Sequence, residues 1–187
     1  MEKYSRIKAL ISLDAIRYNF EQMKKNIKEG TKIIAVIKAD AYGHGAVPIA
    51  RMLEEFDYIW GFAAATAQEA LQLRKAGITR PILILGLVFE EYYKKLAEND
   101  VRMAVCDYET ARKFNKAAEA AGKKGLIHLA ADTGMTRIGF KDSEESLEEI
   151  RRIAALPNVE IEGLFTHFAR ADEYDRTPAM VQLKRYL

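Results

Sequence analysis

One lysine stands where an apolar run ends and a turn with two glycines begins. Lys38 follows the apolar residues 33–37 and precedes the sequence ADAYGHG at residues 39–45. The C-terminal end of a buried parallel strand is where barrel enzymes keep their reactive groups. An amine among apolar neighbours loses part of its preference for the charged form, and an uncharged amine can form an imine with a carbonyl compound. Lys38 is therefore the candidate nucleophile.

Three further side chains with suitable chemistry occupy comparable places. Tyr42 lies in the turn after Lys38, so its hydroxyl is expected near the same strand end. Arg137 follows the turn-forming sequence DTG at residues 132–134, and its planar guanidinium could bind a carboxylate with two hydrogen bonds. His167 ends the last predicted strand, where its flat ring could stack on an aromatic group.

Metal and dinucleotide patterns are missing. The three histidines lie on separate predicted segments, and Cys106 is far from them in sequence, so the spacing of a zinc site is not present. Residues 43–45, GHG, lack the order G-x-G-x-x-G and the acidic residue that follows it in dinucleotide-binding proteins. We therefore expect no bound metal, and we interpret His44 and His128 as structural.

The composition indicates a globular protein without a strong overall charge. Of its 187 residues, 49% are hydrophobic and 30% are charged, and 29 Lys and Arg stand against 27 Asp and Glu. This balance argues against nucleic acid as a partner, and no apolar run is long enough for a membrane span. A single cysteine and the lack of a leader sequence favour a reducing, cytoplasmic location.

Apolar runs rich in β-branched residues alternate with helical patterns, as in repeated βα units. Helices are predicted over residues 14–27, with Asp14 as N-cap, over residues 67–76 and 108–121, each followed by a glycine, and over residues 180–187. Residues 9–13 are predicted as a short extra strand. The main strands are predicted over residues 32–37, 59–65, 82–85, 103–106, 125–131 and 159–165.

These elements predict an α/β fold with a mainly parallel sheet of about six βα units. A closed (β/α)8 barrel typically has about 250 residues, more than are present here. We therefore expect a partial TIM-type barrel that forms a single domain over residues 1–187. Because open edges of a parallel sheet invite pairing with a second chain, we also expect a homo-oligomer.

Three segments carry a resemblance to a known family. Residues 35–45, AVIKADAYGHG, look like the pyridoxal phosphate attachment motif of bacterial alanine racemases. His128 with DTGMTRIGF at residues 132–140, and GLFTHFA at residues 163–169, agree with that family in order and spacing. The similarity extends from about Ile11 to the last residue and covers only the N-terminal part of the family's chain.

The resemblance implies a pyridoxal 5'-phosphate-dependent isomerase that interconverts L-alanine and D-alanine, with D-alanine used for peptidoglycan. Lys38 would carry the cofactor as an internal aldimine and serve as one of two acid/base groups at the substrate α-carbon. Tyr42, Arg137 and His167 would bind the cofactor, and Arg137 would also bind the substrate. The cofactor would act as the electron sink of the reaction.

Two departures from the family's pattern bear on activity. At the position of Ala130 the family commonly has a lysine, often carbamylated, which orients the arginine matching Arg137, so Arg137 is expected to be less firmly held here. The family's second base is a tyrosine of a C-terminal β domain, supplied across a dimer interface, and this sequence does not include that domain. Lys38 alone would exchange a proton on one face only, so we expect little racemase activity from these residues.

Two other functions remain open. The chain could be a cofactor-binding barrel without catalysis, similar to the small pyridoxal phosphate homeostasis proteins of the same fold type, although these lack the sequence of residues 40–45. It could also be a structural fragment that associates through its sheet edges and binds no cofactor. A coloured adduct at Lys38 would distinguish the first of these from the second.

Overall fold

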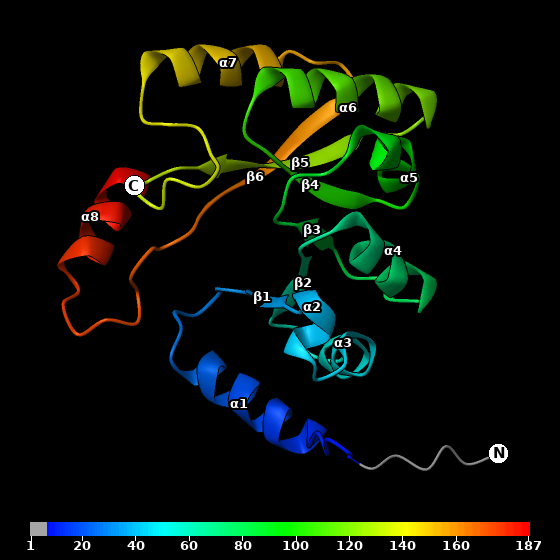
Figure 1. Cartoon of the computed structure of the whole chain (residues 1–187), viewed down its shortest axis with the longest axis vertical. Helices are drawn as coiled ribbons and strands as arrows, with labels where there is room; N and C mark the ends of the chain where they lie inside the picture. Colours follow the sequence, from blue (N-terminus) through cyan, green and yellow to red (C-terminus); the bar gives the residue numbers. More distant parts are fainter. Residues whose placement is uncertain (1–6) are drawn as a thin grey trace.

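A single parallel sheet organises the structure, a computed structural model that describes residues 7–187. All neighbouring strands are parallel and follow one another in chain order, as Figure 1 shows. The predicted α/β class with about six βα units is therefore confirmed. The strands are β1 Ile33–Val36, β2 Ile59–Ala64, β3 Ile82–Ile84, β4 Val101–Val105, β5 Gly125–Ala131 and β6 Val159–Thr166.

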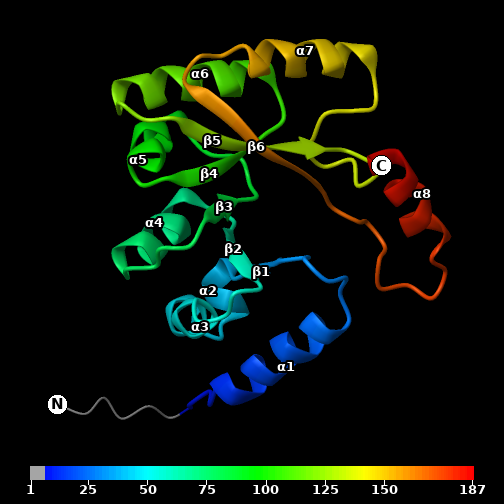
Figure 2. The same cartoon turned by 180° about the vertical axis from the view of Figure 1, so that it is seen from behind.

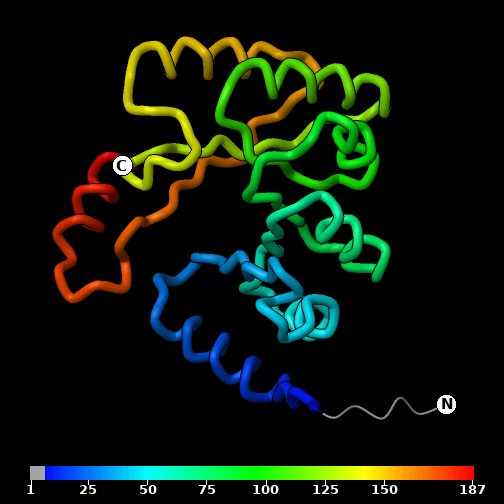
Figure 3. Tube along the Cα trace, viewed as in Figure 1, coloured from blue at the N-terminus to red at the C-terminus, as the bar shows by residue number. Residues whose placement is uncertain are grey.

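The sheet curves into a half-barrel. In the part of the chain that the structure describes, β1 and β6 do not pair with each other, so they form its two edges. The helices α3 to α7 lie along its outer side, whereas α1 and α8 lie near its two edges (Figures 1 and 2). The tube in Figure 3 follows this curved path from α1 to α8. The predicted partial barrel is thereby confirmed.

The helices fill the connections between strands, as expected for βα units. Their bounds are α1 Leu13–Lys25, α2 Lys38–Tyr42, α3 Ala46–Leu53, α4 Ala67–Lys75, α5 Tyr93–Glu98, α6 Tyr108–Ala120, α7 Glu144–Ala154 and α8 Thr177–Tyr186, with the 3-10 helix η1 Glu90–Tyr92 before α5.

The hydrophobic core lies between the sheet and the outer helices. Phe62 of β2, Met103 of β4 and Ile127 of β5 are fully buried there, together with Phe114 of α6. Full burial of one such side chain contributes roughly 1.5–3 kcal/mol. This layer fixes the strands and so the position of their C-terminal ends.

Local capping sets the helix boundaries. The side chain of Asp107 accepts a hydrogen bond from the Thr110 N–H at 2.7 Å and begins α6. Gly77 and Gly122 follow the ends of α4 and α6 with φ of 87° and 63°, a conformation that glycine adopts without strain. Both predicted helix ends are confirmed to within a residue or two.

The N-terminal segment differs from the prediction. Residues 9–12 form no strand, and α1 begins at Leu13. The N-cap is Ser12 rather than Asp14: the Ser12 hydroxyl accepts a hydrogen bond from the Ala15 N–H at 3.2 Å, and Asp14 lies in the first turn, where its charge favours the helix dipole. A short apolar run becomes a strand only beside a partner, and Leu10 is 93% exposed.

Candidate active site

Lys38, Tyr42, Arg137 and His167 line one cavity of about 550 Å³. The cavity lies at the C-terminal ends of the strands, and the rest of its wall is mainly apolar. Small-molecule sites typically enclose about 300–1,000 Å³, and barrel enzymes place theirs at this end of the sheet. The structure thus brings together all four residues singled out from the sequence. The other lining residues are Val36, Ala65, Leu85, Gly86, Leu87 and Ile138.

Lys38 stands two residues after the end of β1 and is half-buried. Its Nζ lies 6.0 Å from the centre of the Tyr42 ring, close enough for a weak attraction between the ammonium and the aromatic face. The amine therefore shares one side of the cavity with the Tyr42 ring.

The backbone after Lys38 forms a left-handed turn. Ala39, Asp40, Ala41 and Tyr42 have φ between 50° and 56°, and Gly43 continues with φ of 86°. For residues other than glycine this conformation costs roughly 1–2 kcal/mol each, so four in succession require support from their surroundings. The glycines of this turn were expected to bend the chain, but the left-handed residues before them were not foreseen.

Two carboxylates that sequence reasoning missed support this turn. Asp40 Oδ1 accepts a hydrogen bond of 2.7 Å from the N–H of Ala46, the first residue of α3. Glu69 Oε1 accepts one of 2.8 Å from the N–H of Ala39. The turn is thus fastened at both ends.

Arg137 reaches the cavity from a turn after β5. Asp132 Oδ1 accepts hydrogen bonds from the N–H groups of Gly134 (3.0 Å) and Thr136 (2.8 Å) and so shapes this turn. The guanidinium is exposed and forms no hydrogen bond or ion pair within residues 7–187. The methyl group of the buried Ala130 offers it no partner. A guanidinium in this state can bind an anion through several N–H groups.

His167 follows directly on β6, and a buried glutamine holds its backbone. Gln182 of α8 donates from Nε2 to the His167 carbonyl at 3.1 Å and to Thr133 Oγ1 at 3.1 Å. Its Oε1 accepts a hydrogen bond from the Ala169 N–H at 2.8 Å. Gln182 therefore joins the segments that carry His167 and Arg137, a link that no local sequence pattern signals.

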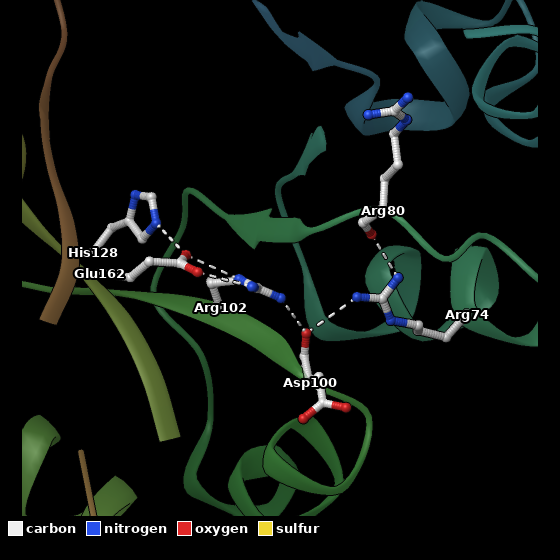
Figure 4. A network of polar contacts seen from close by, with 6 residues as sticks. All are labelled: Arg74, Arg80, Asp100, Arg102, His128 and Glu162. Atoms are coloured by element: carbon white, nitrogen blue, oxygen red, sulfur yellow. Dashed lines mark hydrogen bonds and ion pairs between the residues drawn. The ribbon is translucent and has the colours of Figure 1, made fainter. Parts of the chain in front are cut away.

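A polar network occupies the inner side of the sheet, nearer the N-terminal ends of the strands (Figure 4). Arg102 of β4 donates two hydrogen bonds, of 3.0 and 2.8 Å, to the carboxylate of Glu162 on β6. His128 Nε2 of β5 lies 2.9 Å from Glu162 Oε2, and its ring packs against Trp60. The bonds from Arg102 hold the pKa of Glu162 below its ordinary value against the opposing effect of burial, and His128 adds to the lowering.

The same network continues at the N-terminal ends of the strands. Arg102 and Arg74 both donate to the Asp100 carbonyl oxygen, at 2.9 and 3.1 Å, and Arg74 also donates to the Arg80 carbonyl oxygen at 2.7 Å (Figure 4). The guanidinium of Arg74 thus donates to backbone oxygens, and that of Arg102 to a backbone oxygen and the Glu162 carboxylate. We therefore interpret this end of the sheet, including His128, as structural.

Two kinds of feature are missing from residues 7–187. No three side chains of the types His, Cys, Asp and Glu are grouped so that they could hold a metal ion. No helix there combines the length and the apolar character that crossing a membrane requires.

Comparisons of sequence identify one family. Residues 11–187 match the model of the family described as "Alanine racemase, N-terminal domain". An alanine racemase of Clostridium tetani is 42% identical over 179 residues, which are 96% of this chain and 46% of that protein. An alanine racemase of Clostridium kluyveri is 44% identical over 186 residues, which are 99% of this chain and 47% of that protein.

Solved structures agree with this result. The alanine racemase of Clostridium difficile 630 in complex with cycloserine superposes with a TM-score of 0.91 at 43% identity, covering 94% of this chain and 48% of that one. A histidine racemase from Leuconostoc mesenteroides gives a TM-score of 0.85 at 30% identity, covering 94% and 47%. The chain therefore spans about half the length of the relatives it matches.

Proposed function

The chain belongs to the alanine racemase N-terminal domain family, and from that premise we propose that it is the lysine-bearing barrel domain of a pyridoxal 5'-phosphate-dependent alanine racemase. The proposed domain extends over residues 1–187. The observation that carries the proposal is the convergence of Lys38, Tyr42, Arg137 and His167 on one cavity.

The residues around the cavity fit this cofactor. Lys38 offers a primary amine for the aldehyde, and the unpaired guanidinium of Arg137 can donate hydrogen bonds to the phenolic oxygen of the ring. His167 offers a flat ring for stacking, and Tyr42 a hydroxyl. When bound, the cofactor withdraws electrons from the substrate α-carbon and so weakens its bond to hydrogen.

Lys38 has two tasks in this proposal. Its Nζ would hold the cofactor through the aldehyde group. Its amine would also remove or return a proton at the substrate α-carbon, from the side on which Lys38 lies. Acid/base assistance of this kind contributes roughly 10²–10⁴-fold to a rate.

Arg137 is proposed as the group that also orients the substrate. Alanine carries a carboxylate, and a planar guanidinium without another partner can bind it with two hydrogen bonds. The same proposal assigns the product D-alanine to peptidoglycan synthesis and the protein to the cytoplasm, where its single cysteine stays reduced.

Association with further polypeptide is part of the proposal, and we infer a homo-oligomer. Two apolar side chains of β1 on the inner side of the sheet are well exposed, Ile34 (37%) and Val36 (43%), and on β6 Leu164 is exposed (47%) on the opposite, helix-bearing side. The edges of β1 and β6 also carry backbone groups without strand partners among the described residues. Exposed apolar side chains and open edges both favour contact with another chain.

Isotope exchange tests the function. The 187-residue chain is incubated with pyridoxal phosphate and either L- or D-alanine in deuterated water, and both deuterium at the α-carbon and inversion are measured by chiral chromatography with mass detection. We expect one enantiomer to exchange its α-proton with little inversion, because Lys38 is the single base that this proposal assigns to the α-carbon.

Each alternative gives a different result. Colour from bound cofactor without exchange of either enantiomer would favour a binding barrel without catalysis. A chain that stays colourless would favour a structural fragment. Rapid inversion of both enantiomers would refute the one-sided role of Lys38.

A further inference from the structure

We infer that Glu69 is a positioning residue for Lys38. Its carboxylate fastens the backbone directly after the amine-bearing residue to the end of the neighbouring strand. The inference rests on the function proposed for Lys38 and concerns a residue that does not line the cavity.

Glu69 belongs to a capping box at the start of α4. The Thr66 hydroxyl accepts a hydrogen bond from the Glu69 N–H at 3.3 Å, and Glu69 Oε2 accepts one from the Thr66 N–H at 3.3 Å. In a capping box the carboxylate satisfies the N-terminus of its own helix. These two bonds alone would make Glu69 an ordinary helix cap.

The same carboxylate also binds the ends of two strands. Oε1 accepts a hydrogen bond of 2.8 Å from the N–H of Ala39, after β1, and Oε2 accepts one of 2.8 Å from the N–H of Ala65, after β2. Both distances are shorter than those within the capping box. Glu69 therefore forms shorter hydrogen bonds with the residues that follow β1 and β2 than with the capping box of α4.

The bond to Ala39 controls the direction of Lys38 through the peptide plane. The Lys38 carbonyl and the Ala39 N–H belong to one planar peptide unit, so fixing the N–H fixes the ψ angle of Lys38. Residues 39–42 then run in the left-handed conformation, which is unfavourable without such support. The charged acceptor at the start of this turn thus defines where the side chain of Lys38 leaves the backbone.

Ala39 is exposed, and this decides what loss of the bond would do. Water can replace the lost acceptor, so the N–H is not left without a partner. The expected consequence is a mobile turn and a poorly directed amine rather than an unfolded protein. Glu69→Gln keeps the size of the side chain but turns one acceptor oxygen into a donor that faces an N–H group.

Glu54 provides a matched control. Its Oε1 accepts hydrogen bonds from the N–H groups of Thr79 (2.7 Å) and Arg80 (3.0 Å), just before β3. Glu54→Gln therefore removes the negative charge from an acceptor of backbone N–H groups at the opposite end of the sheet from the cavity, where the amide oxygen can still accept these bonds. Any general effect of losing a carboxylate that binds backbone N–H groups appears in both variants.

The experiment compares wild type, Glu69→Gln and Glu54→Gln by two measurements. Amide hydrogen exchange in the peptide 38–45 reports on the turn, with no cofactor added. The rate at which pyridoxal phosphate becomes fixed to Lys38, trapped with borohydride and located by peptide mass, reports on the amine. In Glu69→Gln we expect exchange to rise and attachment to slow, each by about tenfold, as for loss of a hydrogen bond to a charged group. In Glu54→Gln both are expected to match wild type.

Other outcomes reject the inference in distinguishable ways. Unchanged exchange in Glu69→Gln would show that the carboxylate does not hold the turn, and faster exchange with unchanged attachment would make it a purely structural cap. Equal effects in Glu54→Gln would show a loss of overall stability. If wild type itself acquires no pyridoxyl group at Lys38, both the proposed function and this inference are wrong. If every variant acquires the group at the wild-type rate, only this inference is wrong.

Discussion

The side-chain amide of Gln182 donates a hydrogen bond of 3.1 Å to the carbonyl oxygen of His167. Because Gln182 also binds Thr133 Oγ1 and the N–H of Ala169, one buried side chain of α8 holds both the exit of β6 and the turn after β5. The distance between His167 and Arg137 in the cavity therefore depends on where α8 docks.

Replacing this amide with a hydrocarbon should destabilise the fold. Gln182→Leu removes three hydrogen bonds, with the Ala169 N–H, the His167 carbonyl and the buried Thr133 hydroxyl, and a hydrogen bond contributes about 0.5–1.5 kcal/mol. Chemical denaturation measures the loss of unfolding free energy. The control is Gln72→Leu on the exposed face of α4, expected to change it by less than about 0.5 kcal/mol. Equal effects of the two substitutions would contradict the role given to Gln182.

Gly163 is predicted to be required by the neighbouring histidine. A Cβ at this position would lie 2.7 Å from His128 Nδ1, so Gly163→Ala forces the imidazole to move away from Glu162. We expect a loss of about 1–3 kcal/mol in unfolding free energy, as for overpacking. In a His128→Ala background the same substitution should have little effect, because the clash is gone. An equally large loss of unfolding free energy in the His128→Ala background would show that Gly163 is required for a reason other than contact with His128.

The ion pair at Glu162 should make stability depend on pH. In the folded chain the pKa of Glu162 lies below its ordinary value of 4.5, mainly through its hydrogen bonds with Arg102, so the unfolded chain takes up the proton first as the pH falls. The carboxylate therefore contributes stability that is fully present above about pH 4.5 and is lost as the pH drops through the folded pKa.

A pH series of urea denaturation checks this sign. The difference in unfolding free energy between wild type and Glu162→Gln should be largest near neutral pH and shrink below about pH 4.5. Glu160→Gln serves as the control, because Glu160 is an exposed carboxylate of the same strand that forms no ion pair among the described residues. A difference that stays constant from neutral to acid pH would show that charge on Glu162 does not stabilise the fold.

Arg137 is predicted to hold the cofactor through its charge. Arg137→Gln should raise the dissociation constant for pyridoxal phosphate by about tenfold or more, since a hydrogen bond to a charged group contributes about 1.5–3 kcal/mol. Titration followed by visible absorbance gives this constant. Lys141→Gln, an exposed cation on the same connection, is the control. Similar weakening in both variants would indicate a general effect of positive charge rather than a contact.

The sequence was sufficient for the layout of the sheet because burial leaves a periodic signal. Runs such as residues 125–131 are apolar at every position except His128, as expected when helices cover one side and the barrel interior the other. The same signal was misleading at residues 9–12, because an apolar run does not reveal whether a neighbouring strand exists.

Details of the site depended on contacts between distant residues. The capping pattern of Thr66 and Glu69 is legible in the sequence, but the bond from Glu69 to Ala39 spans 30 residues, and that from Gln182 to Thr133 spans 49. The left-handed turn at residues 39–42 contains no glycine, the residue that usually marks this conformation. Motif resemblance located Lys38, Tyr42, Arg137 and His167, whereas the supports around them required the fold.

Peptide mapping after borohydride reduction of the chain with pyridoxal phosphate tests most directly whether Lys38 is the reactive amine. We predict that the pyridoxyl group is found on Lys38 far more than on exposed lysines such as Lys141, and that Lys38→Arg abolishes both the specific label and the visible colour. Labelling spread evenly over the exposed lysines, or colour that persists in Lys38→Arg, would contradict the assignment of this cavity as the cofactor site.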